Sequence, residues 1–154
     1  MDAPTPPAPP SGTLQGPLHL FPLRVYYEDT DVSGMVYHAN YLRWFERARS
    51  DLLRLLGIEQ SKAYDEGLGN YTVAELTIRY LAPARLDDAV TVATAALELG
   101  AASVRLRQRA LRDDTLLAEA TVRVGFIAPD GRPRRQPSAW RAAFETLQPA
   151  KDPV

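Results

Sequence analysis

The densest group of chemically capable residues lies in the stretch EDTDVSGMVYHANY, residues 28–41. Three acidic residues occur within its first four positions, and a glycine, a histidine and an asparagine follow them. Carboxylates can bind a metal ion, act as a nucleophile or base, or close a turn. These three possibilities make different demands on the neighbouring residues, so they can be compared one by one.

The first interpretation is a calcium loop. Residues 29–34, DTDVSG, match its opening pattern of alternating oxygen ligands before an invariant glycine. The twelfth position of such a loop should supply a bidentate glutamate, but Asn40 stands there. The loop should also leave a helix, whereas the residues before this stretch have the pattern of a strand. We therefore predict no calcium site.

The second interpretation is a transition-metal centre, which needs clustered histidine or cysteine side chains at fixed spacing. The chain has no cysteine, and His38 is the only histidine in the part that we expect to fold. We therefore expect no zinc or iron site. The lack of cysteine also excludes a disulfide framework and a thiolate nucleophile.

The third interpretation is a catalytic corner. Residues 35–40 lead into a predicted helix, so the backbone N–H groups near His38 are free donors at the positive end of the helix dipole. Such an end can bind an oxyanion, and Asp31, seven residues upstream, would stay ionised there as a nucleophile or base. The alternative is that Asp29 and Asp31 merely end a strand and close turns. The residues alone leave both interpretations open.

The elements that position this stretch can be predicted from hydrophobic spacing. Partial alternation predicts a strand over residues 23–28, and Asn40 is placed to cap a helix that ends near Gly57. Apolar residues of that helix recur at three- and four-residue steps: Tyr41, Trp44, Phe45, Ala48, Leu52, Leu55 and Leu56. This wide apolar face predicts a largely buried helix.

The rest of the chain has mostly β-type patterning. We predict strands over residues 72–81, 89–99, 103–111 and 116–128, and a short last helix over residues 138–147. The short breaks between these strands indicate a four-stranded antiparallel meander. One long apolar helix with about five strands predicts an α+β domain in which an antiparallel sheet curls around the helix.

Length and composition favour one domain. The chain has 154 residues, 45% of them hydrophobic, and a net charge of −1, so no global field attracts nucleic acid. Residues 1–22 hold seven of the thirteen prolines and no Lys or Arg, which predicts a disordered tail before a domain over residues 23–148. We expect no secretory signal and no membrane span, and therefore a cytoplasmic protein.

Three segments resemble one known family. They are YYEDTDVSGMVYHANYLRWFERAR (residues 26–49), RYLAPARLDD (79–88) and AEATVRVGFIAPDGRPRRQP (118–137). They resemble the 4-hydroxybenzoyl-CoA thioesterase-like hotdog proteins, and among these the acyl-CoA thioesterases associated with the Tol-Pal gene cluster. The similarity extends from about Leu23 to Leu147. The family's hotdog fold, a sheet around one long helix, agrees with the architecture predicted from hydrophobic spacing.

The resemblance also implies an activity. The family's catalytic aspartate falls on Asp31, which would attack an acyl-CoA thioester or activate water, and the backbone amide of His38 would polarise the thioester oxygen. The products would be a carboxylic acid and free CoA, with no metal or organic cofactor. A second hotdog subclass uses a helix glutamate as its catalytic acid, so Glu46 is the reserve candidate.

Several residues are predicted to bind the substrate. They are Gly34, Tyr37, Asn40 and Tyr41 around the helix entry, and Arg132, Arg134 and Arg135, whose forked donors suit the CoA phosphates. A solvated turn remains the alternative for the three arginines. The thiol carrier is CoA or an acyl carrier protein, and the sequence does not decide between them.

Assembly and function have further expectations. An edge strand favours pairing across a two-fold axis, so we expect a homodimer or homotetramer, in which the family builds each active site from two chains. A hotdog dehydratase or hydratase is the rival enzyme, because His38 and Asp31 could shuttle a proton. A non-catalytic acyl-carrier or envelope-complex binding protein is the rival outside catalysis.

Overall fold

One curved antiparallel sheet organises the molecule. The computed structural model describes residues 2–147, and within them six strands lie in the order β1-β2-β4-β5-β6-β3. The strands are β1 (Thr13–Gln15), β2 (Leu18–Arg24), β3 (Asn70–Tyr80), β4 (Ala89–Leu99), β5 (Ser103–Arg112) and β6 (Thr115–Ile127). The helices are α1 (Asn40–Leu55), α2 (Gln60–Asp65) and α3 (Ser138–Glu145), with a 3₁₀ turn over Tyr27–Asp29.

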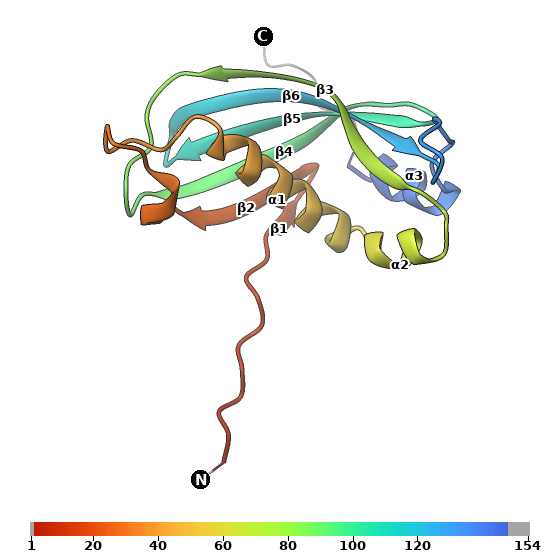
Figure 1. Cartoon of the computed structure of the whole chain (residues 1–154), viewed down its shortest axis with the longest axis horizontal. Helices are drawn as coiled ribbons and strands as arrows, with labels where there is room; N and C mark the ends of the chain where they lie inside the picture. Colours follow the sequence, from red (N-terminus) through yellow and green to blue (C-terminus); the bar gives the residue numbers. More distant parts are fainter. Residues whose placement is uncertain (1, 148–154) are drawn as a thin grey trace.

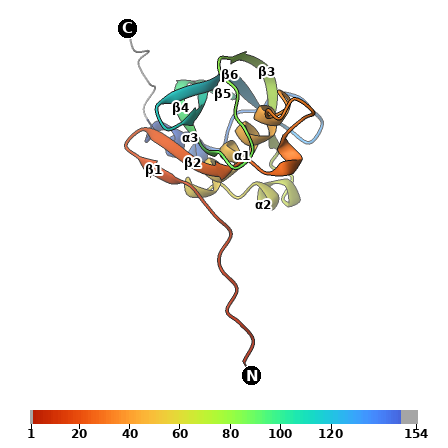
Figure 2. The ribbon, with the colours of Figure 1, turned by 90° about the vertical axis from the view of Figure 1, so that its left-hand side faces the viewer.

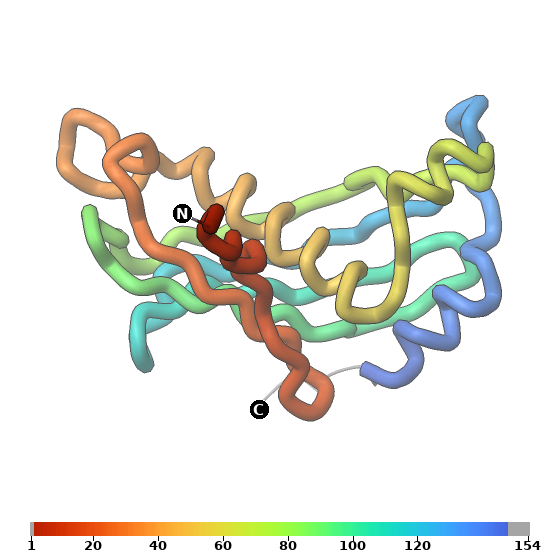
Figure 3. The backbone as a smooth tube through the Cα atoms, turned by 90° about the horizontal axis from the view of Figure 1, so that it is seen from below, coloured from red at the N-terminus to blue at the C-terminus, as the bar shows by residue number. Residues whose placement is uncertain are grey.

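The sheet curls around α1, as Figure 1 and, end-on, Figure 2 show. Helix α1 lies along the concave face, and α3 closes one end of the sheet (Figure 3). This arrangement confirms the predicted α+β hotdog fold, a curled antiparallel sheet around one long central helix. No helix within residues 2–147 is long and apolar enough to cross a membrane.

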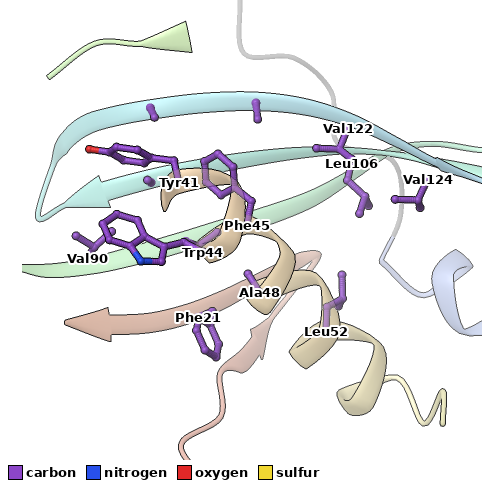
Figure 4. Close-up of a cluster of buried hydrophobic side chains, with 14 of the residues drawn as sticks. Phe21, Tyr41, Trp44, Phe45, Ala48, Leu52, Val90, Leu106, Val122 and Val124 are labelled. Atoms are coloured by element: carbon purple, nitrogen blue, oxygen red, sulfur yellow. The ribbon is translucent and has the colours of Figure 1, made fainter. Parts of the chain in front are cut away.

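The core forms between α1 and the concave face. Phe45, Ala48 and Leu52 are fully buried, and they follow the three- and four-residue spacing that predicted a buried helix. They point toward strand side chains such as Leu106 and Val122 (Figure 4). Truncating a buried phenylalanine to alanine typically costs about 3–5 kcal/mol, so Phe45 alone contributes much of a small domain's stability. This packing fixes where the start of α1 lies.

The N-terminal prediction was wrong in its second half. Residues 13–24 form the β1 and β2 hairpin instead of belonging to a tail over residues 1–22, and the strand expected over residues 23–28 ends at Arg24. His19 and Phe21 alternate with more exposed residues and point into the core, a pattern that the prolines of this region obscured. Pro22 is compatible with a strand because β2 has no β1 partner beyond Leu20.

The predicted four-stranded meander is also wrong. Strands β4, β5 and β6 are consecutive neighbours, but β3 pairs with β6 and not with β4. The connection over residues 81–88 therefore crosses the sheet, and it packs on the loop before α1. The Val36 N–H donates to the Ala84 carbonyl at 2.9 Å, and Met35 pairs with Arg85 in an isolated antiparallel β-bridge. Because of this crossover, β3 lies at the open edge of the sheet, and its end reaches the start of α1.

The end of the domain agrees with the sequence to within two residues. Helix α3 begins at Ser138 as predicted and ends at Glu145, while Leu147 is still buried. Residue 148, the predicted end of the domain, lies outside the described residues. On β5, Arg105 and Arg109 alternate with the buried Leu106 and Gln108, so the arginines lie on the convex face.

Candidate active site

The stretch that holds Asp31 is a tight loop, not an open ligand cluster. Thr30 and Val36 form a bridge at its base. The Asp31 N–H donates to the Met35 carbonyl at 2.9 Å, and the Gly34 N–H donates to the Asp31 carbonyl at 3.0 Å. Gly34 has a φ of +80°, which a side chain would strain. Gly34 is thus needed for the turn, and its predicted role in substrate binding remains a prediction.

The Asp31 carboxylate is exposed and ionised at neutral pH. The Ser33 hydroxyl and the Ser33 N–H both donate to Asp31 Oδ1, the latter at 2.8 Å. These hydrogen bonds hold the pKa of Asp31 below its ordinary value, and His38 lowers that pKa further by electrostatic attraction. The side chain is therefore a ready base or nucleophile. Its second oxygen has no partner among the described residues.

Asp29 and Asn40 hold the loop against the start of α1. Asp29 accepts hydrogen bonds from the Tyr26 N–H and from Asn40 Nδ2, both at 2.8 Å. These contacts favour the structural interpretation of Asp29. The predicted helix cap at Asn40 is wrong, because α1 starts at Asn40 after Ala39 and the Asn40 side chain bonds back to Asp29 instead.

At the helix entry, two peptide groups have carbonyls that accept hydrogen bonds and N–H groups that remain available as donors. The Tyr37 carbonyl accepts from the Asn40 N–H at 2.9 Å, and the His38 carbonyl accepts from the Tyr80 hydroxyl at 2.8 Å. In a trans peptide the N–H points opposite to the carbonyl. Within residues 2–147, the N–H groups of His38 and Ala39 have no backbone or side-chain acceptor. They are placed to bind an oxyanion.

Tyr80 is a site residue that sequence reasoning missed. Tyr80 is the last residue of β3 and stands 42 positions after His38, so no local spacing signals their contact. Its ring also packs edge-on against His38 and Tyr41, with centroids 6.0 and 5.6 Å apart. Burial raises the pKa of Tyr80, so its hydroxyl keeps its proton and remains a donor. The only signal in the sequence was its place inside the segment RYLAPARLDD.

A shallow cavity of about 280 Å³ opens beside the helix entry. His38, Tyr41 and Tyr80 line one part of it, and Val36 and Leu81 line an apolar part. Tyr37 is exposed and packs edge-on against His38, with centroids 4.6 Å apart. The structure thus gathers several predicted residues at one place, and their surroundings suit a group with a polar end and an apolar body.

The three arginines predicted to bind CoA lie elsewhere. They follow β6 at the end of the sheet opposite the Asp31 loop, as Figures 1 and 3 show. Arg134 donates to the Leu68 carbonyl at 2.8 Å, and Arg132 lies 4.0 Å from Asp130 in an exposed pair. Within one chain these arginines do not reach the candidate site.

Glu46 is exposed on α1, eight residues after His38, which is about 12 Å along a helix axis.

His38 is not the only histidine of the fold, because the buried His19 lies 2.7 Å from Asp51. That correction follows from the missed strand β2. Within residues 2–147, no three His, Cys, Asp or Glu side chains gather in a way that could hold a metal ion.

Comparison with known proteins agrees with this architecture. The family model of the thioesterase-like superfamily matches residues 25–147. The acyl-CoA thioesterase YbgC of Haemophilus influenzae is 41% identical over 129 residues, which cover 83% of this chain and 95% of that protein. The acyl-CoA thioester hydrolase YbgC of Escherichia coli O157:H7 is 39% identical over 130 residues, which cover 83% of this chain and 96% of that protein.

A solved structure extends the comparison to three dimensions. A probable thioesterase from Bartonella henselae superposes with a TM-score of 0.74 at 36% identity, over 78% of this chain and 99% of that one. The family match covers most of the chain, including α1 and the strands around it. The chain belongs to the thioesterase-like superfamily of hotdog proteins.

Proposed function

We propose that this protein hydrolyses acyl-CoA thioesters to a carboxylic acid and free CoA, with Asp31 as the catalytic carboxylate. The observation that carries the residue assignment is an exposed, ionised carboxylate beside a helix entry that offers open N–H groups. The activity itself is supported by relatives that are about 40% identical and are acyl-CoA thioesterases. A thioester carbonyl is already electrophilic, so these few groups suffice.

Asp31 can carry out the hydrolysis by two routes, as a general base or as a nucleophile. As a base, Asp31 takes a proton from water while the water oxygen attacks the carbonyl carbon. The C–S bond then breaks, and the proton passes to the departing thiolate. As a nucleophile, the Asp31 oxygen bonds to the carbonyl carbon, the thiolate leaves, and water hydrolyses the resulting anhydride. In both routes the N–H groups of His38 and Ala39 stabilise the oxyanion, and one such donor is typically worth about 2.7–4 kcal/mol.

The edge strand β3 favours pairing with a second chain. Strand β3 is an exposed edge whose central residues, 72–75, have open side chains. An exposed edge of this length invites pairing with a copy of itself. In a two-fold antiparallel pair, the Tyr80 end of one β3 lies beside the Asn70 end of the other. We infer a homodimer, which can associate further into a tetramer.

The same two-fold pairing supports the substrate assignment. In one chain, Tyr80 is hydrogen-bonded to the helix entry, and Arg134 is hydrogen-bonded to Leu68, just before β3 begins. Pairing therefore brings the Arg132–Arg135 turn of one chain toward the Asp31 loop of its partner. The arginines would then read the phosphates of CoA while Asp31 acts on the thioester. This contact favours CoA over a carrier without a nucleotide.

An acyl-CoA panel tests the proposal. The purified protein is given saturated aliphatic and aromatic acyl-CoA substrates, and free thiol is followed with time. Release of thiol by the wild type and its loss in Asp31→Asn are expected. A dehydratase or hydratase would release no thiol from saturated substrates, and a binding protein would hold acyl-CoA without turnover.

A further inference from the structure

A second cavity, of about 200 Å³, lies between the C-terminal half of α1 and the start of β3. Its deeper wall is apolar and includes Leu53, Leu106 and Phe144. Arg49 contributes a charged group to the lining. Within one chain the cavity is about 17 Å along α1 from His38. In the proposed dimer it lies at the paired β3 edge, because Thr72 and Val73 also line it.

Arg49 is held in place by a buried network. Its side chain is only 9% exposed, and Arg49 Nη1 donates to Gln108 Oε1 at 2.8 Å. Gln108 is itself fixed, because its Nε2 donates to the Phe45 carbonyl at 2.9 Å and to Thr94 Oγ1 at 3.1 Å. The guanidinium is thus oriented before any ligand arrives, and most of its five N–H donors remain unused.

The charge of Arg49 is not matched by a close acid. Among residues 2–147, no carboxylate oxygen lies within 4.0 Å of its nitrogens, whereas Arg109 and Arg112 each have an acid at 2.9 Å. Glu46, exposed at the mouth of the cavity, acts on Arg49 only at longer range. Burial lowers the pKa of Arg49, but a guanidinium stays charged at neutral pH. A mostly buried charge without a close counter-ion is costly, and an anion in the cavity would supply that counter-ion.

We propose that this cavity binds the carboxylate of a small carboxylic acid, with the carboxylate on Arg49 and the apolar body against Leu53 and Phe144. Both the charge and the apolar wall are needed for this ligand class, since a bare inorganic anion would leave the wall unused. The proposed reaction releases acids of this class, so the choice of ligand rests on the proposed function. The measurement of binding does not require turnover.

Calorimetric titration of the full chain with hexanoate and benzoate, and with the matching neutral amides, tests the inference. We expect the wild type to bind a carboxylate at least about tenfold more tightly than its amide, as a charge-assisted hydrogen bond implies. Arg49→Met should remove this preference. Arg47→Met, the same change at an exposed position two residues earlier, should leave it intact. Glu46→Gln should tighten carboxylate binding several-fold, because it removes a repelling charge from the mouth.

Three results would overturn the inference: no carboxylate binding by the wild type, equal binding of acid and amide, or a preference that survives Arg49→Met. If Arg49→Met does not fold, the wild-type acid and amide comparison and Glu46→Gln still decide, and weaker carboxylate binding in Glu46→Gln would count against the proposal. Thiol release is measured on the same wild-type sample. Hydrolysis without carboxylate preference refutes only this inference, and carboxylate binding without hydrolysis refutes only the proposed function.

Discussion

Tyr80→Phe removes one oxygen atom from the candidate site and keeps everything else. The lost hydroxyl donates to the His38 carbonyl at 2.8 Å, while the ring contacts with His38 and Tyr41 do not involve it. Tyr80 is 45% exposed, so water can donate a hydrogen bond to the His38 carbonyl when the hydroxyl is absent. We therefore expect the free energy of unfolding to fall by only about 0.5–1.5 kcal/mol.

The expected effect on catalysis is larger than the effect on binding. Without the hydroxyl, the peptide between His38 and Ala39 is less firmly held, and the N–H groups at the helix entry lose part of their alignment. A whole oxyanion donor is worth about 2.7–4 kcal/mol. Losing roughly half of one donor's effect lowers kcat by about tenfold, which corresponds to about 1.4 kcal/mol. The ground-state substrate does not use this alignment, so KM should change by less than about twofold.

Steady-state thiol release with an acyl-CoA substrate measures both constants. Tyr64→Phe is the matched control, because Tyr64 is an exposed tyrosine on α2, away from the helix entry, and its variant should equal the wild type. Urea unfolding of both variants separates a loss of fold from a loss of alignment. A Tyr80→Phe enzyme with wild-type kcat, or one whose KM alone rises, would refute the positioning role.

Three further predictions follow from the loop, the core and the edge strand. Ser33→Ala removes the hydroxyl donor but keeps the backbone N–H donor, so a carboxyl NMR titration should show the pKa of Asp31 rising part of the way toward its ordinary value. The acid limb of the kcat/KM profile should move to higher pH with it, because the active, ionised carboxylate then forms at higher pH. An unchanged titration would show that the Ser33 hydroxyl is dispensable. Phe45→Ala should cost about 3–5 kcal/mol in urea unfolding, since Phe45 is fully buried, and a loss below 1 kcal/mol would contradict the packing described. Ala74→Pro should weaken self-association in light scattering without unfolding the chain, because Ala74 sits at the β3 bulge and has no partner in β6; an undiminished dimer would place the interface elsewhere.

The parts of the fold that could be predicted from the sequence are those governed by local spacing. Helix α1 and strands β4 to β6 have regular apolar periods, because each buries one face against the same core. Strand β2 was missed because Pro22 and the proline-rich residues before it have the composition of a disordered tail. His19 and Phe21 nevertheless point into the core and alternate with more exposed residues. The partner of β3 is decided by a crossover that brings distant segments together, and no local pattern specifies it.

The candidate site divides in the same way. Asp31, Gly34 and His38 stand within eight positions and could be singled out together from the sequence. The Tyr80–His38 contact joins residues 42 positions apart, so only the folded chain reveals it. The same holds for the Arg49–Gln108 contact at the second cavity, which joins residues 59 positions apart. The cap predicted at Asn40 failed because a side-chain amide near a helix start has several possible partners, and here Asp29 is the partner.

The central claim is that the Asp31 carboxylate performs the hydrolysis. Asp31→Asn keeps the size of the side chain and its acceptor oxygen for Ser33 but removes the charge, so the fold should be retained. The measurement is the initial rate of thiol release from the best acyl-CoA of the panel, by wild type and variant at equal concentration. A missing general base or nucleophile predicts a fall in kcat of at least about a hundredfold. Turnover by Asp31→Asn near the wild-type rate would contradict the account.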